Sequence, residues 1–130
     1  MYSAEALEIE KTKMVYLKAV SARQELIYKK MERENGVESA EESLIEQDMI
    51  AEEVEAEMKG AKKLSAKDQM KLELKKSQCG TNKLRVLIMV EDKKEEVQRI
   101  SDHIALQETI IEETKGLLDG LGGTEGFVEV

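Results

Sequence analysis

Proline and tryptophan are both missing from this chain of 130 residues, and it contains a single phenylalanine. Without proline, no position loses the backbone donor that a helix needs, and with so few aromatic residues a sandwich core is poorly supplied. Charged residues make up 37% of the chain, which favours long helices with solvated faces. We therefore predict an all-α fold of long amphipathic helices, in a helical bundle or coiled coil that forms one domain.

Cysteine and long apolar runs are also scarce. Cys79 is the only cysteine, so no internal disulfide can form, and residues 1–5 lack the basic and apolar regions of a secretory signal. The longest apolar run, 86–90, is far shorter than the roughly 20 residues that cross a bilayer. These features predict a cytoplasmic protein without direct membrane insertion. The net charge of −8 repels phosphate backbones, so we expect no nucleic-acid partner.

No group of residues is typical of a catalytic or metal site. Cys79 and His103 are the only residues of their kinds, and no orienting group or oxyanion loop accompanies them. One histidine and scattered carboxylates do not make a convincing transition-metal site. The glycines after residue 119 follow a helical pattern and lack the spacing of a phosphate-binding loop. We expect a non-enzymatic protein without cofactor or metal.

Glycines and capping residues divide the sequence into four helical segments. Asn35-Gly36 is suited to a left-handed helix end, Gly60 stops the next segment, and Gly80 stops the one after it. Serines in capping boxes begin the second and third segments. The predicted helices cover about residues 3–34, 39–59, 65–78 and 82–121, with a flexible tail at 122–130.

Charge is segregated on the two sides of Gly60. Residues 31–58 carry eleven acidic side chains and one arginine, whereas residues 59–76 carry seven lysines and two acids. If the chain folds back across Gly60, these faces pair, although each exposed ion pair contributes only roughly 0 to 1 kcal/mol. Two solvated faces without mutual partners are the open alternative.

The first segment carries a sparse apolar stripe at helical spacing, interrupted by Ser21 and Gln24. We expect this stripe to form a wall of the bundle rather than to lie on a membrane. The seven methionines of the chain could form an adaptable binding groove, although methionine more often fills gaps in a core. The stripe consists of Leu7, Met14, Leu17, Tyr28 and Met31.

The fourth segment has the clearest heptad pattern. With Val90 at an a position, eight of the eleven a and d sites in 86–121 are apolar, against 41% in the whole chain. Met89, Ile110 and Leu117 occupy neighbouring g sites, which favours a bundle of three or more helices. The sites expected to bind a partner helix are Val90, Lys93, Val97, Ile100, Ile104, Gln107, Ile111, Leu118 and Leu121.

This segment also resembles a known family. Residues 84–92, then Glu95, Val97, Arg99 and Ile100, and finally 117–123 are similar to the Qb SNARE motif of SNAREs of the synaptosome-associated-protein type. The resemblance implies a helix that joins three others in a parallel four-helix bundle, whose assembly draws two membranes together. Lys93 stands where the family's central layer has glutamine. The layers implied after that centre are Val97, Ile100, Ile104, Gln107, Ile111, Thr114, Leu118 and Leu121.

Together these patterns predict a protein that mediates assembly by packing its fourth segment against protein helices, in a homo- or hetero-oligomer. The resemblance suggests a SNARE-like role in membrane trafficking. The alternative is a helical secretion or folding chaperone, or an adaptor, that shields the amphipathic helix of a client protein.

Overall fold

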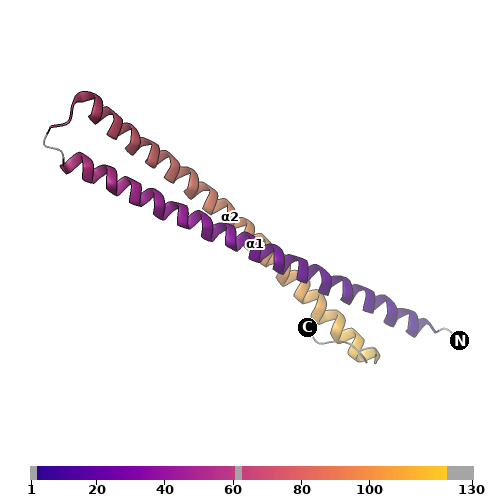
Figure 1. Ribbon diagram of the computed structural model, residues 1–130. Coiled ribbons are helices and arrows are strands. Elements are labelled where there is room, and N and C mark those ends of the chain that lie inside the picture. The colour runs from indigo at the N-terminus through magenta and orange to yellow at the C-terminus, as the bar shows by residue number, and fades with distance from the viewer. Residues whose placement is uncertain (1–2, 61–62, 123–130) are drawn as a thin grey trace. The chain divides into compact units, whose positions relative to one another are not determined.

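The computed structural model describes residues 3–60 and 63–122, which form two long helices. Helix α1 covers Ala4–Gly60 and helix α2 covers Ala66–Leu121 (Figure 1). No strand occurs within the described residues. The predicted all-α class is therefore confirmed.

Serine side chains cap the starts of both helices. The Ser3 Oγ atom accepts a hydrogen bond from the Ala6 N–H at 3.1 Å, and the Ser65 Oγ atom accepts one from the Asp68 N–H at 3.2 Å. Each serine satisfies a backbone donor that has no partner within the first helical turn. At the end of α2, Gly122 has a φ of 71°, in the left-handed region that glycine adopts most readily. The outer ends of the helices agree with the sequence prediction to within one residue.

Two predicted interruptions are wrong, because α1 continues through Asn35-Gly36 and α2 continues through Cys79-Gly80. The four predicted segments are therefore two helices. A glycine inside a helix costs about 1 kcal/mol relative to alanine, which packing of a helix face can outweigh. Packing is close at both places, since Ala40 is 4% exposed and Cys79 is 8% exposed. The predicted tail at 122–130 lies outside the described residues except for Gly122.

The two helices contribute to two compact units. A turn unit comprises residues 33–96, and a terminal unit comprises the described residues of 1–32 and 97–130. In the terminal unit, the Arg23 Nε atom donates a hydrogen bond to the Glu108 Oε1 atom at 3.2 Å. In the turn unit, ion pairs join rising numbers on α1 to falling numbers on α2, so the two helices are antiparallel. These pairs are Arg33 with Glu96, Glu41 with Lys94, Asp48 with Lys83 and Glu55 with Lys76.

The inner face of α1, which packs against α2, repeats every seven residues from Ile9 to Met58. All fifteen residues at its two heptad positions are buried or half-buried, and Tyr16 and Val54 are only 3% exposed. An unbroken seven-residue period keeps one stripe of a helix turned toward a partner helix. The face consists of Ile9, Thr12, Tyr16, Ala19, Arg23, Leu26, Lys30, Arg33, Val37, Ala40, Leu44, Gln47, Ala51, Val54 and Met58.

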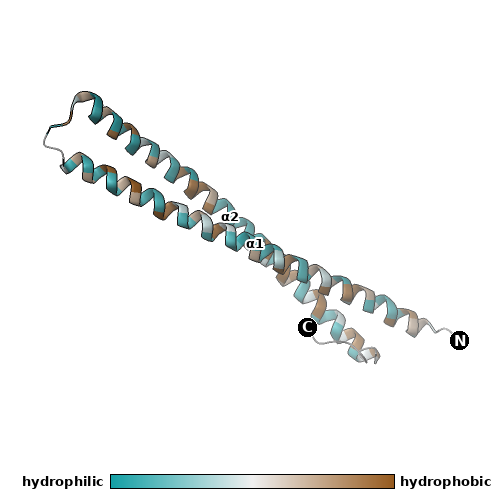
Figure 2. Ribbon diagram, in the orientation of Figure 1, coloured by the Kyte–Doolittle hydropathy of each residue, from teal (hydrophilic) through white to brown (hydrophobic). Residues whose placement is uncertain are grey.

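Hydrophobic residues are not confined to the inner faces. Figure 2 shows brown, hydrophobic positions at intervals all along both helices. Leu118 is fully buried, yet its neighbour Leu117 is 60% exposed. Each helix therefore leaves apolar side chains in solvent after its inner face has been packed, and these residues are the candidates for a functional surface.

Candidate helix-docking surfaces

The predicted seam of α2 faces inward. Every one of its eleven a and d sites from Val86 to Leu121 is buried or half-buried. Val90 and Ile100 are 6% and 7% exposed, and Leu118 has no exposed surface. The heptad register deduced from the sequence is therefore confirmed for these residues. That they bind a separate partner helix stays a prediction.

Within each unit, the inner face of α2 is packed against α1. Lys93 illustrates this in the turn unit, because a methyl group added at Gly36 of α1 would lie 3.0 Å from the Lys93 Nζ atom. The glycine leaves room for the lysine side chain to cross the helix interface. A partner helix could bind the same face of α2 only if α1 moved away.

The first half of α2 combines apolar and basic positions on its inner side. Leu72 and Cys79 are buried, whereas Lys76 and Lys83, which continue the a positions, are exposed. Their Nζ atoms pair with carboxylates of α1, at 3.0 Å for Lys76 with Glu55 and 2.7 Å for Lys83 with Asp48. Of the two alternatives left open by the sequence, pairing of the acidic and basic stretches across the turn is therefore found at Glu55 and Lys76, whereas Lys83 lies beyond the basic stretch 59–76.

Lys76 also changes the acidity of its partner. Its hydrogen bond to Glu55, together with its positive charge, lowers the pKa of the Glu55 carboxyl from its ordinary value. The charge of Lys59 acts in the same direction, while the smaller effect of desolvation opposes it. Glu55 is solvated, so the pair marks the register of the two helices more than it stabilises them.

The apolar stripe of the first segment was expected to form a wall of the bundle, but within the single chain it is exposed. Leu7, Met14, Leu17, Tyr28 and Met31 are all between 53% and 72% exposed. They occupy the side of α1 opposite its inner face, together with the exposed Ser21 and Gln24. We call these seven residues the outer stripe. The inner face was missed because it carries Arg23, Lys30 and Arg33, which make it no more apolar than the outer stripe. A heptad count from Ile9 could have found it.

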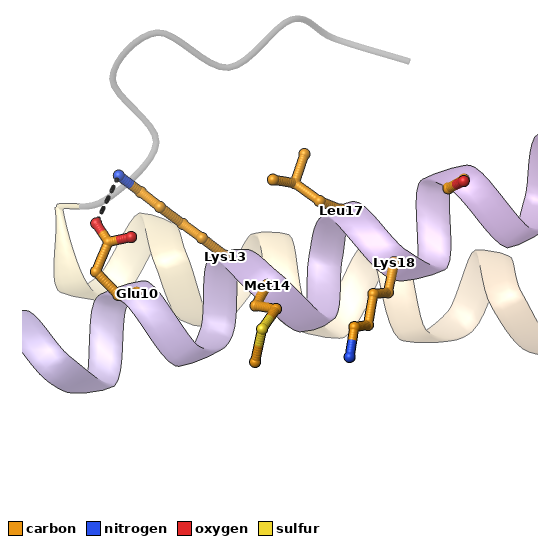
Figure 3. Close-up of a pocket in the computed structure, with 6 residues that line it drawn as sticks. Glu10, Lys13, Met14, Leu17 and Lys18 are labelled. Carbon is orange, nitrogen blue, oxygen red and sulfur yellow. Dashed lines mark ion pairs between the residues drawn. The ribbon is translucent and has the colours of Figure 1, made fainter.

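A shallow hollow of about 400 Å³ lies on the outer stripe (Figure 3). Its lining comes from α1 alone, with Met14 and Leu17 between Lys13 and Lys18. At one end, Lys13 pairs with Glu10 at 3.7 Å. A second hollow, of about 470 Å³, continues along the helix around Leu7. Hollows formed by a single helix are gaps between rows of side chains, of the kind that a second helix fills when it packs.

Helix α2 has a shorter exposed apolar patch in the turn unit. The run 86–90 is divided between two sides, with Val86 and Val90 inward and Leu87, Ile88 and Met89 between 41% and 61% exposed. Of the other g sites, Ile110 is half-buried and Leu117 is exposed. The widened stripe predicted for this helix is therefore only partly covered by α1.

The two residues considered for catalysis belong to different units. Cys79 is a buried thiol of the turn unit, and His103 is an exposed residue of the terminal unit. Within residues 3–60 and 63–122, no three histidine, cysteine or acidic side chains gather closely enough to hold a metal ion. What the described residues do offer is apolar helix surface with charged edges, which suits packing against another helix.

Comparison with protein-family models, with curated proteins and with solved structures yields no match. In the described part of the chain, neither helix has a stretch that is both long and apolar enough to span a membrane. The candidate surfaces therefore have to be interpreted from their own geometry.

Proposed function

We propose that this chain is a non-enzymatic assembly protein that binds protein helices on the outer stripe of α1. One observation supports the proposal: α1 carries two apolar stripes at heptad spacing, one packed against α2 and the other exposed. A helix with two such stripes is typical of bundles of three or more helices. An exposed apolar stripe with polar edges is also typical of an interaction surface. A cytoplasmic setting, without nucleic acid as a partner, remains part of the proposal.

Partner capture with a matched pair of variants tests this function. Leu17 in the outer stripe and Leu106 on α2 are 55% and 58% exposed, so a change to glutamate places a charge in a similar environment at both sites. Leu17→Glu should remove most partner binding, because a carboxylate buried under a docked helix costs several kcal/mol. Leu106→Glu should leave binding unchanged. Native mass spectrometry of the captured complexes gives the partner and its stoichiometry, and equal binding by both variants would contradict the proposal.

A chaperone or adaptor for amphipathic client helices is the second candidate. It is favoured by the methionines, since five of the six that the structure describes are exposed, namely Met14, Met31, Met49, Met70 and Met89. Flexible methionine side chains suit a surface that accepts varied partners. A chaperone should keep an amphipathic helical peptide soluble at stoichiometric ratio and should fold without it. A structural subunit should gain stability only with its specific partner.

SNARE-like assembly is also still a proposal, and it requires α2 to exchange α1 for three partner helices. Such an assembly would place Lys93 in the central layer among partner side chains. Lys93→Gln should then strengthen binding to three complementary SNARE helices, because it removes a buried ammonium that lacks a matching charge. Native mass spectrometry of the mixture is the measurement. No complex, or equal complex with either residue, would contradict a SNARE-like role.

A further inference from the structure

The outer stripe of α1 is bordered by charges in a definite order. Along one edge, at intervals of seven residues, stand Lys11, Lys18, Glu25 and Glu32, all of them exposed. The first half of this edge is therefore basic and the second half is acidic. An edge of this kind is complementary to itself when it is reversed.

Four of the five apolar residues of the stripe, Met14, Leu17, Tyr28 and Met31, have the same property. Consider a second α1 lying antiparallel on the first, with the twofold axis passing between residues 22 and 23. Met14 of one copy then lies opposite Met31 of the other, and Leu17 lies opposite Tyr28. Next to the axis, Ser21 of each copy meets Gln24 of the other, where the hydroxyl can accept a hydrogen bond from the side-chain amide.

This same alignment also pairs the charged edges. Lys18 of one copy comes within two residues, roughly 3 Å along the axis, of Glu25 of the other copy. Lys11 comes equally close to Glu32. Each pair occurs twice because the interface is isologous. A parallel arrangement would instead place the basic halves together and the acidic halves together, which repels the wrong orientation.

We propose that a second copy of this chain occupies the outer stripe, forming an antiparallel twofold dimer through residues 11–34 of α1. The proposal rests on the assembly function above and names its partner. The polar layer of Ser21 and Gln24 fixes the register, as single polar layers do in coiled coils. The inner faces stay packed within each copy. Along the interface the dimer therefore contains four helices, α1 and α2 of each copy.

Charge reversal and charge exchange test the dimer with the full chain. Lys18→Glu and Glu25→Lys should each raise the dimer Kd about tenfold, because each turns two attractive pairs into two repulsive ones. The double variant Lys18→Glu/Glu25→Lys restores unlike charges across the interface and should return the Kd to within about threefold of the original. Sedimentation equilibrium measures the Kd, and circular dichroism shows that each variant stays helical.

Two controls separate specific pairing from net charge. Lys67→Glu changes an exposed residue of α2 in the turn unit and shifts the net charge as much as Lys18→Glu does, so the Kd should be unaffected. If net charge alone controlled the dimer, Glu25→Lys would lower the Kd, because it reduces the net negative charge of each copy. Specific pairing predicts the opposite, a higher Kd. In a mixture of light and isotopically heavy copies, a zero-length crosslink should join Lys18 of one copy to Glu25 of the other.

A chain that remains monomeric throughout the micromolar range would overturn the dimer. So would a dimer that tolerates both single reversals, or one in which the exchange gives no recovery. If the chain is monomeric but Leu17→Glu still prevents capture of a different partner, the assembly function stands and only the identity of the partner is wrong. If neither self-association nor capture depends on Leu17, the assembly function at this surface fails as well.

Discussion

Gly36 and Gly80 both lie inside the long helices, but their surroundings differ. A methyl group at Gly36 would meet the end of the Lys93 side chain, whereas at Gly80 it would meet nothing within 4 Å. Neither glycine has a positive φ, so alanine fits the backbone at both positions. The two sites thus separate the intrinsic cost of glycine in a helix from the effect of a neighbouring side chain.

Gly80→Ala should raise the free energy of unfolding by up to about 1 kcal/mol, because alanine favours the helix and meets no obstacle. Gly36→Ala should also stabilise the protein but by less, since the flexible Lys93 ammonium has to move aside. Urea denaturation of the two variants measures both effects. A loss of stability in Gly36→Ala would mean that Lys93 is held rigidly in the interface.

The Glu55–Lys76 pair gives a prediction about pH. Because the folded-state pKa of Glu55 is lowered, the pair favours folding above the carboxyl's ordinary, unfolded-state pKa, and this contribution is lost as the pH falls through the lower folded-state value. Lys76→Met should raise the pKa of Glu55 toward its ordinary value, as measured by carboxyl NMR titration. Lys83→Met removes the neighbouring cross-helix pair instead and should leave Glu55 unchanged. If Lys83→Met raised it equally, the pairing register would be wrong.

At the scale of the helices, the seven-residue period separates inner from outer residues sharply. Leu118 is fully buried and Leu117, its neighbour, is 60% exposed. Leu118→Ala should lower the free energy of unfolding by about 2 to 5 kcal/mol, whereas Leu117→Ala should change it by less than about 1 kcal/mol. Thermal denaturation monitored by circular dichroism compares the two. Equal losses would contradict the orientation of α2.

The inner face of α2 could be predicted from the sequence, but the inner face of α1 could not. The inner face of α2 is mostly large and aliphatic between residues 86 and 121, so its register followed from hydrophobic spacing. The inner face of α1 instead includes Thr12, Gln47 and three basic residues, and the outer stripe is as apolar. Which stripe turns inward depends on the opposing helix, and spacing within α1 alone carries no information about that.

The helix ends were predicted correctly from the sequence, whereas the two interruptions inside the helices were predicted wrongly. Capping serines and the left-handed Gly122 act locally, so the ends could be predicted from short motifs. Asn35-Gly36 and Cys79-Gly80 have the same local character as a helix end. They remain helical because residues on both sides are packed against the other helix, a contact between distant parts of the sequence.

For the whole molecule, packing one apolar stripe of α1 while leaving another exposed predicts an assembly larger than one chain. Of the five exposed methionines, the four with the largest exposed fractions are Met14, Met31, Met49 and Met70, at 53%, 56%, 58% and 71% in the single chain. Only Met14 and Met31 belong to the outer stripe. A helix docked on this stripe should shield their sulfur atoms and leave the other two in solvent.

Oxidative footprinting of the assembled protein tests this most directly, because methionine oxidation reports access to each side chain. In concentrated protein, or in a complex captured with its partner, Met14 and Met31 should oxidise several-fold more slowly than in dilute protein, while Met49 and Met70 keep their rates. If all four methionines oxidise at unchanged rates in every assembly that the chain forms, the outer stripe of α1 is not the surface through which it works.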